Sequence, residues 1–135
     1  MKTSSLIKNA ILFAIIAFLG YTFINKLLKL DSFALNIIKT NVFDGIWTYV
    51  AVAYALVSEL ACIVTLIFKE RIGKILTLAV ILSYTVYILY LWFNNLYEVC
   101  GCGGILNGLE FHWHFGINVV LITTLLYLNV YEEKN

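Results

Sequence analysis

Four long apolar runs constrain the fold of this chain most strongly; they occupy residues 9–27, 45–68, 75–94 and 111–131. Each run approximates the ~20 residues that an α-helix needs to cross the hydrocarbon core of a bilayer. A helix satisfies its own backbone hydrogen bonds in lipid, whereas a β-barrel needs shorter segments of alternating polarity, which this sequence lacks. We therefore predict an all-α fold, a four-helix transmembrane bundle that forms a single domain over residues 1–135.

The composition supports a membrane environment. Hydrophobic residues make up 62% of the chain and charged residues 13%, against about 45–50% and about 25% in soluble domains. The mean hydropathy is +0.92, and the absence of proline favours uninterrupted helices. The net charge of +1 gives no basic surface for nucleic acid, so we expect membrane lipid as a partner and no nucleic acid.

The N-terminus resembles a signal peptide, because Lys2 and Lys8 precede an apolar stretch. No small-x-small cleavage site followed by a polar region comes after it. We therefore expect this segment to be retained as the first spanning helix.

The basic residues predict the orientation. Six of the nine lie at the N-terminus, between the second and third runs, or after the fourth run: Lys2, Lys8, Lys69, Arg71, Lys74 and Lys134. Lys26, Lys29 and Lys39 fall on the opposite side, and the connection between the third and fourth runs has no basic residue. The positive-inside rule then predicts a multi-pass protein of the bacterial cytoplasmic (inner) membrane, with both termini cytoplasmic.

The connection at residues 28–44 is too polar to span the membrane and too long for a tight turn. Phe33, Ile37 and Ile38 recur in it near helical spacing, with lysine and asparagine between them. This pattern predicts a short amphipathic segment at the outer interface.

The third connection carries the sequence Cys-Gly-Cys-Gly-Gly at residues 100–104, which includes two of the three cysteines. The predicted orientation puts it on the outer face, where disulfides persist. Closing so short a ring removes little entropy from the unfolded chain, so the pair suits exchange better than structural cross-linking. Cys100 and Cys102 are therefore a candidate redox pair; the alternative is two unrelated interfacial cysteines.

His112 and His114 give an H-x-H pattern on the same side as the cysteines. Thiolate and imidazole together suit zinc or copper, so an alternative metal site would consist of Cys100, Cys102, His112 and His114. We favour the interpretation without a metal site. On a helix, the two histidine rings would point about 200° apart. His112 would instead stabilise a cysteine thiolate, or both histidines would belong to an interfacial belt.

Polar residues also lie within the predicted spans. Glu59 is near the middle of the second span, where an ionised carboxylate is costly, so we expect it to be protonated or paired. Two sets of polar residues would line an internal cavity or bond between helices: Tyr54, Ser58 and Cys62, and Ser83, Tyr87, Tyr90 and Asn94. Cys62 lies ~24 Å from the outer face by helical rise, so a direct relay to Cys100 is not expected.

These features resemble the MauE branch of the DoxX-like membrane proteins. The resemblance rests on four spans, Glu59 in a Ser-Glu-Leu stretch, the 100–104 sequence, Asn118 early in the fourth span, and the end of the first span at 26–28. The common family form has phenylalanine where Gly103 stands. The family implies a redox-associated membrane protein that works with exported thioredoxin-like or cysteine-containing proteins, as in maturation of a disulfide-rich methylamine dehydrogenase subunit.

By position, the resemblance implies that Cys100 and Cys102 are the redox pair, with Glu59 and Asn118 as intramembrane functional residues. The architecture also resembles the vitamin K epoxide reductase type, which uses two cysteine pairs and a quinone. This chain has one pair and the distant Cys62, so we do not expect an autonomous relay from a disulfide to a quinone. A quinone stays a candidate cofactor, and no cofactor is assigned. We expect a membrane thiol–disulfide oxidoreductase that assists maturation of exported proteins; the alternatives are a non-catalytic scaffold or chaperone and a metal-handling protein.

Overall fold

The computed structural model describes residues 2–96 and 110–134, and every regular element among them is helical. The elements are α1 (Lys2–Leu28), α2 (Leu30–Lys39), α3 (Ile46–Phe68), α4 (Glu70–Phe93) and α5 (Phe111–Glu133). All but α2 are long and apolar enough to span a membrane. The predicted all-α bundle of four spanning helices is therefore confirmed. Cys100 and Cys102 lie outside the described residues.

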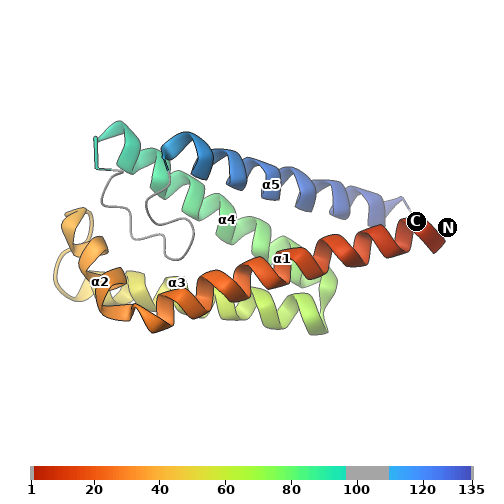
Figure 1. The fold of residues 1–135 in the computed structure, drawn as a ribbon, viewed down its shortest axis with the longest axis horizontal. Helices are drawn as coiled ribbons and strands as arrows, with labels where there is room; N and C mark the ends of the chain where they lie inside the picture. Colours follow the sequence, from red (N-terminus) through yellow and green to blue (C-terminus); the bar gives the residue numbers. More distant parts are fainter. Residues whose placement is uncertain (1, 97–109, 135) are drawn as a thin grey trace.

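The bundle has two distinct ends (Figure 1). The start of α1, the end of α5 and the α3–α4 turn lie toward one end, which we call the terminal end. The α2 end contains α2, the end of α4 and the start of α5. Helix α3 packs on α1, α2 and α4, and α4 also packs on α5. The segment between α4 and α5 therefore begins and ends at the α2 end.

The turn between α3 and α4 is very short, with only Lys69 between the two helices. Its backbone N–H donates to Thr65 at 2.7 Å, and its carbonyl accepts from the N–H of Gly73 at 2.9 Å. A Cβ atom at Gly73 would lie 2.5 Å from the backbone nitrogen of Leu66. Glycine therefore allows the two helices to approach closely enough to form this turn.

Helix α2 confirms the predicted amphipathic segment, though over a shorter range than residues 28–44. Phe33 and Ile37 are buried one turn apart and pack with Val52 and Ala55 of α3. Ile38, which we expected on the same face, is 46% exposed. An i, i+4 pair lies on one helical face, whereas the next residue is rotated by about 100°.

Two spans begin earlier than the sequence predicted. Helix α1 includes Lys8, and α4 includes Glu70 and Lys74, although the expected spans began at residues 9 and 75. Lys8, Glu70, Lys74 and Glu132 form a group of ion pairs that we call the charge cluster. Lys8 Nζ lies 2.7 Å from Glu70 and 2.6 Å from Glu132. Lys74 Nζ lies 3.1 Å from Glu70 and 2.5 Å from Glu132. Mutual neutralisation allows these charged residues to be part of the packed helices.

The main apolar core lies between the charge cluster and the middle of the bundle. It is formed by α1, α3, α4 and α5, from Leu12, Ile15, Leu19, Cys62, Leu66, Val80, Ile81, Leu125 and Leu128. Beyond this core, toward α2, the helices enclose a cavity.

Candidate functional site

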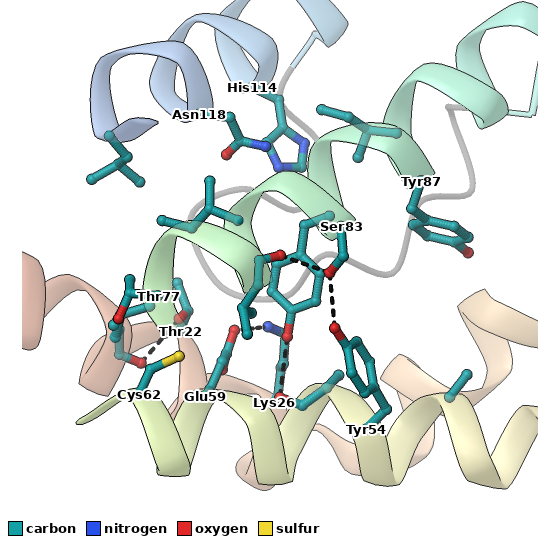
Figure 2. A pocket seen from close by; sticks show the side chains of 18 of the residues that line it. Thr22, Lys26, Tyr54, Glu59, Cys62, Thr77, Ser83, Tyr87, His114 and Asn118 are labelled. Atoms are coloured by element: carbon teal, nitrogen blue, oxygen red, sulfur yellow. Dashed lines mark hydrogen bonds and ion pairs between the residues drawn. The ribbon is translucent and has the colours of Figure 1, made fainter. Parts of the chain in front are cut away.

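The cavity in the α2 half of the bundle has a volume of about 290 Å³ and is lined by residues from all five helices. Its lining is mostly apolar and includes Phe18, Phe33 and Phe43. The polar lining comes from Thr22, Lys26, Tyr54, Glu59, Cys62, Thr77, Ser83, Tyr84, Tyr87, His114 and Asn118 (Figure 2). Six of the ten buried polar or charged side chains among the described residues therefore line this cavity.

A buried ion pair joins α1 to α3 in this cavity. Lys26 Nζ donates to Glu59 Oε1, and the two residues are only 4% and 2% exposed. Glu59 lies ~20 Å along α3 from its start, near the middle of the span. The Lys26 ammonium also lies 5.4 Å from the ring centroid of Tyr84 and 5.8 Å from that of Phe33. Of the two states expected for Glu59, the structure shows the paired one.

The position of Lys26 differs from the one that the sequence predicted. We counted Lys26 among the basic residues on the outer side, but its ammonium turns into the bundle and pairs with a carboxylate. A lysine near the end of a spanning helix was expected to extend toward the interface. A buried carboxylate such as Glu59 needs a buried cation, and this requirement was the sequence signal that could have identified Lys26 as its partner.

The second carboxylate oxygen of Glu59 is left open. Glu59 Oε2 is buried and accepts no hydrogen bond from the part of the chain that the structure describes. Thr22 also lines the cavity, but its hydroxyl donates its single proton to the Leu19 carbonyl at 3.0 Å. The carboxylate of this cavity-lining residue thus retains an unused acceptor site.

Hydrogen bonds between α3 and α4 frame one side of the cavity. The Tyr54 and Ser83 hydroxyls lie 2.9 Å apart, and the Tyr84 hydroxyl donates to the Ala55 carbonyl at 3.2 Å and lies 3.1 Å from the Ser58 hydroxyl. Tyr54, Ser83 and Tyr84 line the cavity and also form hydrogen bonds between α3 and α4. Lining a cavity and bonding between helices, the two roles expected for polar residues in the spans, therefore occur together. Two other members of the predicted α4 polar face, Tyr90 and Asn94, are instead exposed.

Helix α5 contributes His114 and Asn118 to the cavity, and both are buried. Asn118 Nδ2 donates to Thr85 Oγ1 of α4 at 3.1 Å. His112 is exposed, so the two histidines face different sides of α5, as helical geometry predicts. Among residues 2–96 and 110–134, no group of three or more metal-ligating side chains is present. The four-residue metal site stays an alternative, since Cys100 and Cys102 lie outside this range.

Cys62 is a free thiol that is fully buried between Glu59 and the apolar core. It lines the cavity together with Thr77 of α4, whose side chain is also fully buried. The sequence suggested a small buried hydrophobe at this position, and Cys62 does belong to the apolar core. Thr77 was not singled out from the sequence, because threonine is common in spanning helices and carries no pattern of its own.

Comparison with known proteins gives one result for the whole chain. A family model described as methylamine utilisation protein MauE matches residues 4–130. No curated protein and no solved structure matched the chain. The family match runs from the first turn of α1 to the last turn of α5 and includes all the predicted site residues. The chain is therefore a multi-pass integral membrane protein of the methylamine utilisation type and belongs to the MauE family.

Proposed function

We propose that this protein is a membrane thiol–disulfide redox protein that assists disulfide formation in exported proteins. The observation that carries the proposal is the Cys-Gly-Cys-Gly-Gly sequence at residues 100–104, between α4 and α5 of a MauE-family chain. The flanking glycines have no side chains, so they leave access for the thiol of a partner protein. Cys100 and Cys102 are the proposed redox pair.

The proposed reaction is a disulfide exchange. A thiolate of the exported partner attacks one sulfur of a Cys100–Cys102 disulfide, forms a mixed disulfide, and releases the other cysteine as a thiolate. A second partner thiolate then attacks the mixed disulfide, so the partner leaves oxidised and the pair remains as a dithiol. Exchange with the disulfide of an exported thioredoxin-like protein restores the pair. His112 is the proposed stabiliser of the thiolate.

The proposed location is the bacterial cytoplasmic membrane, with both termini in the cytoplasm and the cysteine segment on the outer face. The burial of Lys26 in an ion pair supports this orientation, because only Lys29 and Lys39 remain as exposed basic residues near the α2 end. At the terminal end, Lys69, Arg71 and Lys134 are exposed. The excess of free positive charge at the terminal end agrees with the positive-inside rule.

The bundle interior would support this activity from within the membrane. Glu59 and Asn118 are the proposed intramembrane functional residues, and both line the cavity at the end of the bundle from which the cysteine segment departs. Their contacts with Lys26 and Thr85 join α1 to α3 and α4 to α5 in that half of the bundle. This arrangement supports a rigid base for the exchange site.

Trapping of a mixed disulfide tests the proposal. In cells, Cys100→Ser or Cys102→Ser should trap an exported partner on the remaining cysteine, seen as a reducible high-mass band with an exported protein in it. Cys62→Ser keeps both members of the pair, so it should trap nothing. If neither single variant traps a partner and both retain full maturation activity, the exchange function is wrong. Partner binding that persists in the double serine variant, with maturation intact, would favour the scaffold alternative.

A further inference from the structure

We propose that the cavity binds a membrane-soluble hydroquinone, with Glu59 Oε2 accepting a hydrogen bond from one of its hydroxyl groups. The starting point is the unpaired acceptor: Glu59 lines the cavity and is 2% exposed, and its buried Oε2 accepts no hydrogen bond from the described residues. A buried carboxylate oxygen is costly to leave unpaired, so the cavity favours an occupant that donates a hydrogen bond.

The charge of the site selects a neutral occupant. Lys26 already neutralises Glu59, so the buried pair carries no net charge. A cationic ligand would add an uncompensated charge to an apolar bundle, and an anionic ligand would be repelled by the open carboxylate oxygen. A neutral hydroxyl group supplies the hydrogen bond without either cost.

Polar atoms at separate points of the cavity favour a ring with oxygens on opposite edges. The hydroxyls of Thr77 and Tyr87 are also buried without a hydrogen-bond partner in the described part of the chain. Both residues belong to α4; Figure 2 shows Thr77 near Glu59 and Cys62, and Tyr87 farther along the same helix. Thr77 and Tyr87 are ten residues apart in α4, ~15 Å by helical rise, so a single hydroquinone ring that contacts Glu59 can place its second hydroxyl near one of them but not near both.

The size and walls of the cavity match a single substituted ring. Its volume of about 290 Å³ lies near the lower end of the ~300–1,000 Å³ typical of small-molecule pockets. Aromatic side chains provide flat apolar walls, among them Phe33, Phe43 and Tyr84. A lipid acyl chain would fill the same walls but would leave Glu59 Oε2 unpaired.

The cavity also has access from the membrane. Tyr54 lines it and is 50% exposed on the surface of α3. Its hydroxyl contact with Ser83 of α4 is itself exposed, at a depth of ~12 Å from the start of α3. The cavity lining thus reaches the bundle surface at Tyr54 and Ser83, and we infer that a molecule dissolved in the bilayer enters there, between α3 and α4.

Calorimetric titration of the purified protein in detergent micelles tests the proposal. The probes are decyl-hydroquinone, kept reduced under nitrogen, and its dimethyl ether, which has the same ring and chain but no hydroxyl donor. We expect the hydroquinone to bind about tenfold more tightly, because a hydrogen bond to a charged group contributes on that order. Equal affinities, or no binding of either probe, would mean that water or lipid fills the cavity and would overturn the proposal.

Three variants sharpen the result. Lys26→Met/Glu59→Leu removes both charges together and should abolish the preference for the hydroquinone over the ether. Ala51→Phe places a ring in the cavity from α3 without altering the ion pair, and should abolish binding of both probes. Glu110→Gln, an exposed carboxylate at the start of α5, should change neither affinity. Retention of the preference in the Lys26/Glu59 double variant would contradict the assignment of Glu59.

The binding measurement separates this site from the exchange function. A Cys100→Ser/Cys102→Ser variant should bind both probes as the wild-type protein does, because the cavity residues are unchanged. If trapping of exported partners fails while the hydroquinone preference persists, the exchange proposal falls and the cavity site remains. The opposite outcome removes the cavity site alone.

Discussion

The two halves of the bundle differ in how their lysine–glutamate pairs are arranged and buried. In the terminal half, Lys8 and Lys74 each bridge Glu70 and Glu132, and the charge cluster closes the end of a continuous apolar core. In the α2 half, one lysine meets one glutamate beside a cavity. The first arrangement joins three helices, whereas the second leaves a carboxylate oxygen open.

The difference shows which pair contributes mainly to packing. A buried ion pair contributes little net stability compared with apolar residues of similar volume. In the charge cluster, the cost of burying charge is reduced because each charged group has more than one ionic contact and the carboxylates are partly exposed. The side chains of Glu70 and Glu132 are 34% and 31% accessible. Lys26 and Glu59 have neither advantage, since both are almost fully buried and each has one ionic partner among the described residues. The proposed binding role accounts for the Lys26–Glu59 pair better than a role in stability does.

The largest effect should come from breaking the Lys26–Glu59 pair on one side only. Lys26→Met leaves a buried carboxylate without a counter-ion, and Glu59→Leu leaves a buried ammonium without one. Each change should lower the free energy of unfolding by about 3–5 kcal/mol. The measurement is reversible unfolding in mixed micelles, followed by loss of helical signal.

The matched control is the double variant Lys26→Met/Glu59→Leu. It removes both charges and should recover most of the lost free energy of unfolding, because neither charge is then left unpaired. If the two single losses simply add in the double variant, the residues do not interact as a pair and the contrast between the halves fails.

Gly73→Ala tests how closely packed the terminal half is. The new Cβ would lie 2.5 Å from Leu66 N, a backbone atom that cannot rotate away, so α3 and α4 must separate. We expect a loss of about 3 kcal/mol in the free energy of unfolding. Gly116→Ala in the α2 half is the control, because no neighbouring atom lies within 4 Å of its Cβ position. It should be neutral or stabilising by up to about 1 kcal/mol through helix propensity; equal losses at both glycines would contradict the close approach of α3 and α4.

A smaller loss should follow removal of one lysine from the charge cluster. In Lys74→Met, Lys8 still contacts both Glu70 and Glu132, so the carboxylates keep one cation. The free energy of unfolding should fall by about 2 kcal/mol, the scale of hydrogen bonds to charged groups. Lys69→Met changes an exposed lysine in the adjacent turn and should have little effect. A loss of unfolding free energy as large as that of Lys26→Met would show that Lys8 does not compensate for the missing Lys74 charge, and the contrast with the Lys26–Glu59 pair would fail.

The sequence predicted the fold well because its strongest signals are long and local. The apolar runs set the four spans, and the boundaries of α3 and α4 at Phe68 and Phe93 lie within one residue of the expected ends. The predicted starts of α1 and α4 were too late for a shared reason: Lys8 and Lys74 are charged and were placed outside the apolar runs, but both form ion pairs within the packed helices. A one-dimensional pattern does not contain that pairing.

The candidate site was predictable only in part. Glu59 and Asn118 were identified because polar residues are rare in spans, and both line the cavity. Lys26 was assigned to the interface, since the turn of its side chain toward Glu59 depends on how α1 crosses α3. Tyr87 was predicted to line a cavity and does so, whereas Thr77 was not singled out from the sequence. The roles of Cys100 and Cys102 stay predictions, since both lie outside the described residues.

The smallest effect concerns the neutral contact between Asn118 and Thr85, which tests whether the α2 half depends on hydrogen bonds apart from its ion pair. Asn118 Nδ2 donates to Thr85 Oγ1 at 3.1 Å, and both residues are buried. A double-mutant cycle with Asn118→Leu and Thr85→Val should give a coupling free energy of about 0.6 kcal/mol, the average for such bonds in membrane proteins. The parallel cycle in the terminal half uses Ser4→Ala and Tyr131→Phe, whose hydroxyls form a partly buried contact between α1 and α5. Water competes for that contact near the helix ends, so its coupling should be smaller; a larger value there would mean that neutral polar contacts stabilise the terminal half more than the half that holds the cavity.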